Sequence, residues 1–288
     1  MATLRGIKRR IASVKSTQQI TRAMKMVAAA KLRKAQEQIM AARPYAYKID
    51  EMIKHLVGKL EVITDPLLEV RPTQRVLIVA VTADRGLCGS FNTNIIKRVQ
   101  HQIDTHKDKE IALVCVGRKS FDFFRKQSIH MEEKYIQFFN NLEYIHAQEI
   151  TEFLVNYYKE KKADLIEIVY NEFKNAVQQN IIVETYLPLK AEKFQDVQAT
   201  VDYLYEPDKL SLLNALLPKH LNMQTWRILL ESNASEQGAR MTAMENATDN
   251  AADMIRDLTL HYNKARQASI TKEISEIVGG SEALKSAS

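Results

Sequence analysis

The sequence predicts an α/β fold in which a doubly wound, mainly parallel sheet domain is inserted into a long antiparallel coiled coil of the N- and C-terminal helices. Both ends of the 288-residue chain carry small or apolar residues at alternating steps of three and four, which is the repeat of a coiled-coil seam. Between the ends, apolar strand-like runs alternate with amphipathic helical stretches. We therefore expect terminal coiled-coil helices over 1–58 and 209–288 and a Rossmann-like sheet domain over 75–189.

The C-terminal helix shows the repeat most clearly. No Gly or Pro lies between Gly238 and Gly279. A helix of about 40 residues would be roughly 60 Å long, which exceeds the usual helix length in a compact domain. Such a helix needs a partner along its seam. The expected seam residues are Met241, Met244, Thr248, Ala251, Ile255, Leu258, Tyr262 and Ala265.

The N-terminal helix supplies that partner. Its seam residues are Leu4, Ile7, Ile11 and Val14, and then Ala28, Leu32, Ala35, Ile39 and Ala42. Polar residues at 15–19 interrupt the stripe, so we expect the seam to shift there. Pro44 should kink or end the helix because it lacks an amide hydrogen; if it only kinks the helix, residues 45–57 extend it. An ordinary helical bundle is the alternative arrangement for both helices.

The middle of the chain alternates strands with helices. The run at 75–81 is apolar throughout, as in a strand covered on both faces. Further strands are expected over 111–116, 165–170 and 181–186, and helices over 93–105, 120–126 and 145–161. The last two strands can pair antiparallel because only residues 171–180 separate them, whereas the others should be parallel.

The loop at 83–92, after the first strand, is the one candidate nucleotide site. Its two glycines at a strand-to-helix turn could cradle a phosphate. A P-loop needs Lys and then Ser or Thr after its last glycine, but Ser90 and Phe91 follow here, and a dinucleotide fingerprint needs three glycines. We interpret the loop as a glycine-dependent turn in which Ser90 or Asn92 caps the next helix. No cofactor is expected.

The formal charge of +6 is concentrated at the N-terminus. Residues 1–49 hold twelve Lys or Arg and one acid, Glu37, giving +11, whereas 50–208 carry −5 and 209–288 carry 0. The basic helix suits nucleic acid, an anionic membrane surface or acidic protein loops. No aromatic residue precedes Tyr45 among the basic ones, which weakens the nucleic-acid interpretation.

Other functional signals are sparse. No segment approaches the ~18 unbroken apolar residues that suggest a membrane span. The seven His form no metal-ligand pair with a third partner. Cys88 and Cys115 have no metal or redox spacing, and a reducing cytoplasm is the simplest environment.

Three blocks of sequence carry a family likeness. They are IKRRI at 7–11 with ITRAMKMVA at 20–28, DRGLCG at 84–89 with Phe-Asn at 91–92, and ARMTAMENAT at 239–248 continuing through 258–271. On these blocks the chain resembles the gamma subunit of bacterial F-type ATP synthases over essentially its full length.

The resemblance implies a function. It implies a central-stalk rotor subunit that transmits torque between the membrane c ring and the catalytic alpha/beta hexamer, during proton-driven ATP synthesis or during ATP hydrolysis. The implied partners are the alpha and beta subunits, the epsilon subunit and the c-subunit ring, with one copy of this chain per complex and no nucleic acid. Catalysis would lie in the beta subunits, and the chain would be peripheral at the cytoplasmic face of the bacterial plasma membrane.

The resemblance also implies roles for ten residues, all of them partner contacts. The expected contacts to beta subunits are Met24, Lys25, Arg266 and Gln267. The expected apolar tip in the upper bearing is Ile270, Ile274 and Ile277. The expected foot near the c ring and epsilon is Tyr203, Tyr205 and Glu206. No catalytic, cofactor-binding or metal-binding residue is expected.

Two other classes of function remain open on the residues alone. One is a nucleic-acid-binding coiled-coil protein with a structural α/β insert, which a salt-dependent shift of duplex DNA would favour. The other is a nucleotide-dependent enzyme, which would have to bind nucleotide stoichiometrically.

Overall fold

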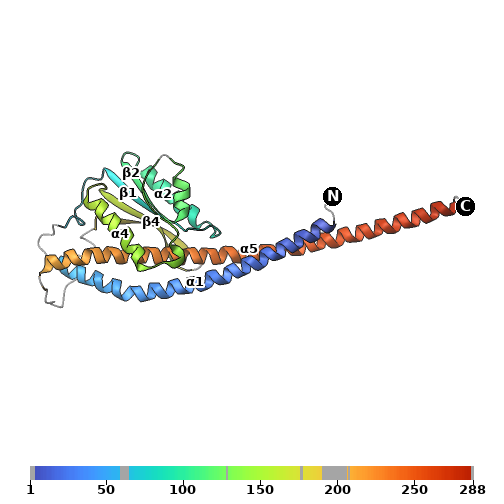
Figure 1. Ribbon diagram of the computed structural model, residues 1–288, viewed down its shortest axis with the longest axis horizontal. Coiled ribbons are helices and arrows are strands. Elements are labelled where there is room, and N and C mark those ends of the chain that lie inside the picture. The colour runs from blue at the N-terminus through green and yellow to red at the C-terminus, as the bar shows by residue number, and fades with distance from the viewer. Residues whose placement is uncertain are drawn as a thin grey trace. The chain divides into compact units, whose positions relative to one another are not determined.

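The computed structural model describes residues 4–58, 65–127, 129–175, 178–189, 206 and 208–286 (Figure 1). The elements in chain order are α1 (Leu4–Gly58), β1 (Arg75–Val81), α2 (Phe91–Thr105), β2 (Glu110–Val116), α3 (Arg118–Phe124), β3 (His130–Tyr135), the 3-10 helix η1 (Phe139–Asn141), α4 (Tyr144–Lys159), β4 (Leu165–Phe173), β5 (Gln179–Leu187) and α5 (Lys209–Ser286). The chain divides into two compact units. The shaft unit comprises residues 1–27 and 242–288, and the sheet unit comprises residues 28–241.

The sheet unit holds five strands in the order β3-β2-β1-β4-β5. Strands β3, β2, β1 and β4 are parallel neighbours, and β5 runs antiparallel to β4 with Val183 opposite Val169. The first strand, β1, lies in the middle of the sheet. The chain adds β2 and β3 on one side of β1 and then β4 and β5 on the other. The expected doubly wound, mainly parallel sheet is confirmed, as is its antiparallel last strand.

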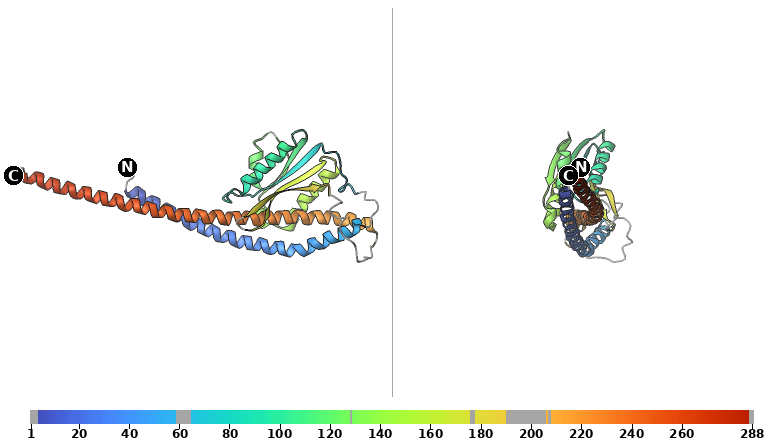
Figure 2. Two further views of the ribbon diagram at one scale, coloured as in Figure 1. Left: turned by 180° about the vertical axis from the view of Figure 1, so that it is seen from behind. Right: turned by 90° about the vertical axis from the view of Figure 1, so that its right-hand side faces the viewer.

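Helices cover both faces of this sheet (Figures 1 and 2). Alternate side chains of β1 enter separate cores because successive strand residues point to opposite faces. Leu77, Val79 and Val81 pack in one core with α4, with residues 49–56 of α1 and with residues 213–230 of α5. Val76, Ile78 and Ala80 pack in the other with α2 and Phe124 of α3.

Strand β3 was not expected from the sequence. Its residues, His130 to Tyr135, contain no fully buried side chain. As an edge strand it can carry charged residues, which protect an open sheet edge from unwanted pairing. The apolar runs that reveal buried strands are therefore missing here.

Within the sheet unit, α1 and α5 also contact each other. Leu32 and Ala35 of α1 are buried against Ala234 of α5. Pro44 lies inside α1, which continues to Gly58, so the proline does not end the helix.

In the shaft unit the two helices pair along the expected seam. On α5, Met244 and Ala251 are buried, and Thr248, Ile255, Leu258, Tyr262 and Ala265 are half-buried. The Thr21 and Thr248 hydroxyls lie 2.8 Å apart, and Lys25 Nζ lies 2.6 Å from Glu245 Oε1. From the first of these contacts to the second, the residue number rises on α1 and falls on α5. The two helices are therefore antiparallel, as predicted.

The expected shift of the seam at residues 15–19 is wrong. The seam on α1 continues through Val14, Gln18 and Thr21 in steps of four and three, since Gln18 is half-buried and Thr21 is buried. A polar residue can hold a seam position when its polar atom is bonded, and the Thr21 hydroxyl both faces Thr248 and donates to the Gln18 carbonyl. The interruption of the apolar stripe is thus a polar layer within a continuous seam.

Candidate partner-binding surfaces

The end of α5 exposes apolar side chains. From Arg266 to Ser281, every residue except Ser269 is exposed. Ile270, Ile274 and Ile277 are 47%, 56% and 71% exposed and are spaced by four and three, so they share one helix face. An apolar stripe left exposed usually marks an interaction surface. The three residues expected as an apolar tip therefore lie together and uncovered in the described part of the chain.

The shaft part of α1 combines exposed apolar and basic side chains. Ile20, Met26 and Val27 are all more than half exposed. Residues 1–27 hold no acid, and their basic residues are Arg5, Lys8, Arg9, Arg10, Lys15, Arg22 and Lys25. Such a surface suits a partner that offers both apolar groups and carboxylates.

The expected contacts to beta subunits lie in different settings. Arg266 and Gln267 are exposed, whereas Met24 and Lys25 are half-buried. Lys25 is engaged by Glu245 across the seam, with both side chains partly exposed. Sequence reasoning missed Glu245, because recognising it as the partner of Lys25 requires the register of the two helices.

The expected foot is only partly visible. Tyr203 and Tyr205 lie outside the described residues, and Glu206 is exposed.

The loop after β1 is held by the chain's own hydrogen bonds. The Asp84 carboxylate accepts hydrogen bonds from the backbone N–H of Arg118 at 3.0 Å and of Gln137 at 2.9 Å. The Gly86 carbonyl accepts from the Arg240 guanidinium of α5. Asp84 and Gly86 are thus tied to other parts of the chain by hydrogen bonds that their oxygen atoms accept. This arrangement supports the structural interpretation of the loop.

The expected cap on α2 is wrong. Ser90 occupies the N-cap position but makes no side-chain capping hydrogen bond. The Asn92 carbonyl oxygen instead accepts from the Ala83 N–H at 2.9 Å, and its amide nitrogen donates to the Arg85 carbonyl. Asn92 thus ties the two ends of the loop together.

α5 anchors this loop through a buried ion pair. Arg240 contacts both Gly86 and the Glu236 carboxylate one helical turn earlier. Burial raises the pKa of Glu236, although Arg240 opposes the shift. The pair joins α5 to the edge of the sheet where β1 ends.

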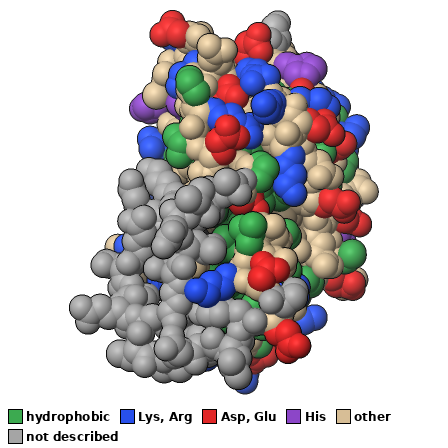
Figure 3. All heavy atoms as spheres, turned by 90° about the vertical axis from the view of Figure 1, so that its left-hand side faces the viewer, with side chains coloured by type: hydrophobic (Ala, Val, Ile, Leu, Met, Phe, Trp, Pro, Cys, Tyr) green, Lys and Arg blue, Asp and Glu red, His purple; other side chains and the backbone are tan. Residues whose placement is uncertain are grey.

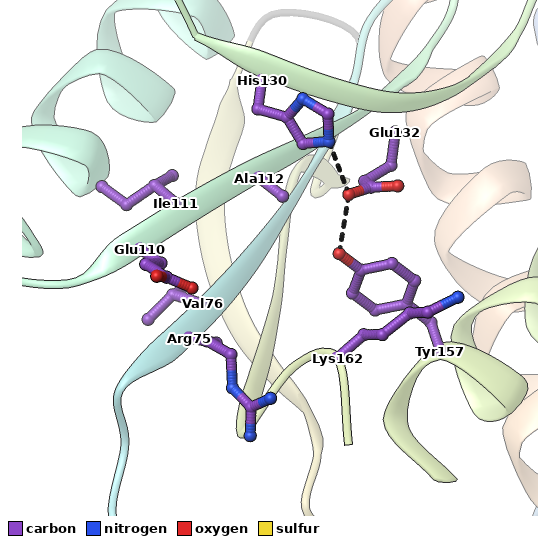
Figure 4. Close-up of a pocket in the computed structure, with 9 residues that line it drawn as sticks. All are labelled: Arg75, Val76, Glu110, Ile111, Ala112, His130, Glu132, Tyr157 and Lys162. Carbon is purple, nitrogen blue, oxygen red and sulfur yellow. Dashed lines mark hydrogen bonds and ion pairs between the residues drawn. The ribbon is translucent and has the colours of Figure 1, made fainter. Parts of the chain in front are cut away.

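A polar cavity of about 340 Å³ lies at the opposite edge, where β1, β2 and β3 begin (Figure 4). In it, Glu132 Oε1 lies 2.8 Å from His130 Nε2 and accepts a hydrogen bond from Tyr157 at 2.9 Å. Arg75 pairs with the buried Asp164 at 2.9 Å. Most of its charged groups therefore have partners within the chain, and among the described residues no cluster of three metal-ligand side chains occurs.

The face of the molecule drawn in Figure 3 shows no strong bias in charge among its described residues. Figure 3 shows basic and acidic side chains interspersed on the upper part of the face drawn, with hydrophobic ones scattered between them. None of the described helices is both long enough and apolar enough to span a bilayer.

Comparison with known proteins identifies relatives along the whole chain. A family model described as ATP synthase matches residues 3–284. The ATP synthase gamma chain of Chloroherpeton thalassium is 50% identical over 301 residues and that of Prosthecochloris aestuarii is 50% identical over 291, each comparison covering 99% of both chains.

Solved structures agree with these relatives. A central stalk and c-ring structure of the Tetrahymena thermophila mitochondrial ATP synthase is similar with a TM-score of 0.62 at 27% identity, covering 79% of this chain and 99% of that one. A Euglena gracilis mitochondrial ATP synthase structure of OSCP, F1 and c-ring gives a TM-score of 0.69 at 22% identity, covering 98% of this chain and 94% of the other, and shows the shared fold.

Proposed function

We propose that this chain, which belongs to the family of ATP synthase gamma chains, transmits torque as the central-stalk rotor subunit of an F-type ATP synthase. It would connect the c ring in the membrane with the alpha/beta hexamer, in one copy per complex, during proton-driven synthesis or hydrolysis of ATP. Its further partner would be the epsilon subunit.

The paired helices of the shaft unit carry this proposal. A rotor must resist torsion, and the shaft unit has a continuous seam with a hydrogen-bonded and ion-paired layer at Thr21–Thr248 and Lys25–Glu245. Beyond Ala265 the seam ends, and α5 continues with its apolar stripe exposed. A surrounding sleeve of subunits would cover that stripe, so we assign Ile270, Ile274 and Ile277 to the upper bearing.

The basic α1 suits acidic loops of the surrounding ring. Charges in water are screened over about 8 Å at physiological salt, so this attraction acts mainly at contact. We assign contacts to beta subunits to Met24 and Lys25 on α1 and to Arg266 and Gln267 on α5. For Lys25 the assignment requires that the ammonium serve a partner carboxylate as well as Glu245.

The remaining assignments follow from membership of the family. The foot toward the c ring and epsilon is assigned to Tyr203, Tyr205 and Glu206. The chain would not itself catalyse, because nucleotide chemistry would lie in the beta subunits. The loop after β1 supports this, because Ser90 and Phe91 follow its last glycine where a P-loop needs Lys and then Ser or Thr. We place the complex at the cytoplasmic face of the bacterial plasma membrane, with this chain peripheral.

Affinity purification in mild detergent tests the proposal. A tagged chain should bring down alpha, beta, epsilon and c subunits in an active ATPase. Recovery of the chain alone, or a salt-dependent complex with duplex DNA in place of the ATPase, would contradict it.

A further inference from the structure

We propose that a cavity between α1, β5 and α5 in the sheet unit is a docking pocket for a partner polypeptide that presents an apolar side chain beside a carboxylate. The cavity has a volume of about 610 Å³, within the range of ligand pockets. Its lining includes Arg43, Ala46 and Tyr47 of α1, Leu189 after β5, and Met223 and Gln224 of α5. The inference rests on one part of the proposed function, namely that this chain works within a complex of several subunits.

The lining of the cavity offers an apolar surface to an occupant. Leu189 and Met223 are themselves buried, and Ala46 is half-buried. Tyr47 is 79% exposed, and Met40, seven residues earlier on the same helix face, is also exposed. Tyr, Met and Arg are enriched in protein interfaces. An apolar side chain from a partner would be covered here on several sides.

One buried acceptor lacks a donor. The Gln224 amide nitrogen donates to Glu184 Oε1 at 2.9 Å, but the Gln224 carbonyl oxygen is buried and has no hydrogen-bond partner among the described residues. Leaving a buried acceptor unpaired costs about 1–3 kcal/mol. The Gln224 side chain lines the cavity, so this amide is part of the polar wall of the pocket.

The charges of the pocket select an acidic occupant. Lys54 pairs with Asp50 at 2.8 Å, and Arg227 pairs with Glu184 at 2.9 Å, so these four charges compensate one another. Arg43 has no ion-pair partner among the described residues and is exposed. Its guanidinium can bind a carboxylate through two parallel hydrogen bonds. The occupant therefore carries an acidic group next to its apolar one.

Photo-crosslinking in the assembled complex tests the pocket. Tyr47 is replaced by p-benzoylphenylalanine, the complex is purified and irradiated, and the crosslinked peptide is identified by mass spectrometry. We expect one partner chain to be captured at an apolar residue within two positions of an Asp or Glu. Arg43→Glu should lower the yield at least fivefold and Arg43→Gln by less. The control Arg33→Glu should leave the yield within twofold, because Arg33 is exposed on the same helix and pairs with Glu37.

The outcomes separate this inference from the proposed function. Assembly is read from co-purification, so loss of assembly by the unsubstituted chain contradicts the proposed function. Intact assembly without a crosslink to another polypeptide contradicts the pocket. Capture of lipid, of a second copy of this chain or of a basic segment also overturns it, as does a yield that Arg43→Glu leaves unchanged.

Discussion

Single polar side chains hold positions that connect distant parts of the chain. The hydroxyls of Thr21 and Thr248 meet in the seam at 2.8 Å. The Asp164 carboxylate, 4% exposed, accepts hydrogen bonds from the backbone N–H groups of Gln74 and Arg75 and from the Arg75 guanidinium. A buried hydrogen bond contributes modestly when it is made, but an unpaired buried group is costly. Loss of one such residue should therefore have a large and specific effect.

Asp164→Asn should destabilise the chain by about 2–3 kcal/mol at pH 7, because charge-assisted hydrogen bonds to a buried carboxylate are lost. Burial alone would raise the pKa of Asp164, but the hydrogen bonds from Arg75 and Gln74 outweigh it and hold the pKa below its ordinary value. The stabilisation from ionised Asp164 is thus present above about pH 4 and is lost as the pH falls through the lower pKa of the folded state.

Urea unfolding across pH checks this expectation. The difference in unfolding free energy between the two proteins should be largest at neutral pH and should shrink below about pH 4. Asp104→Asn, at an exposed carboxylate 3.5 Å from Lys107, is the matched control and should have little effect. A difference that stays constant down to pH 3 would contradict the role of the ionised group.

Gly117→Ala should destabilise the chain by about 2–4 kcal/mol. Gly117 has φ of +95°, and a Cβ added there would lie 2.0 Å from the Thr82 carbonyl oxygen. At Gly86 the nearest atom to an added Cβ is a flexible Lys119 carbon at 3.8 Å. Thermal melting should therefore show a marked loss for Gly117→Ala and a small one for Gly86→Ala; equal melting temperatures would be inconsistent with the close approach.

Among the elements, the seam of the shaft unit should be sensitive to a charge placed at one of its half-buried positions. Ile255→Asp puts a charge at a half-buried seam position and should cost about 1–3 kcal/mol. Met254→Asp, one residue away on the exposed side, is the control and should have a much smaller effect. An unaltered melting curve for Ile255→Asp would show that Ile255 is not a seam residue.

Lys25 lies on the same seam and has two proposed partners. Lys25→Glu should lower ATP-driven proton pumping several-fold at normal assembly, because a glutamate there would repel both Glu245 and the proposed acidic loop of a beta subunit. The charge swap Lys25→Glu with Glu245→Lys should restore the shaft's thermal stability but not the pumping. Full recovery of pumping in the charge-swapped variant would show that Lys25 acts only through its ion pair with Glu245.

The sequence predicted the elements with strong apolar patterns. The apolar run at 75–81 indicated a strand buried on both faces, and β1 is such a strand. The three-four repeat of α5 indicated a helix buried along one stripe, and that stripe is found in the seam. Strand β3 could not be predicted because an edge strand needs few apolar residues. The Lys25–Glu245 pair and the cavity beside Tyr47 depend on register and on packing between distant segments, which periodicity does not specify.

At the scale of the whole molecule, the two units divide the proposed work. The shaft unit has one seam, little apolar burial and a large exposed basic and apolar surface, as suits an element that turns within a ring. The sheet unit has cores on both faces of its sheet and the pocket at α1, β5 and α5. We therefore propose that the sheet unit serves as a rigid attachment for partners while the shaft unit transmits the torque.

Rotation of the chain during ATP hydrolysis tests this central claim most directly. Lys107, which is exposed, is replaced by Cys and labelled with a probe, and the label is selective because Cys88 and Cys115 are both buried. With the alpha/beta ring fixed to a surface and ATP supplied, we expect the probe to turn in one direction for as long as ATP is hydrolysed. Steady ATP hydrolysis with a probe that stays fixed relative to the ring would contradict the account.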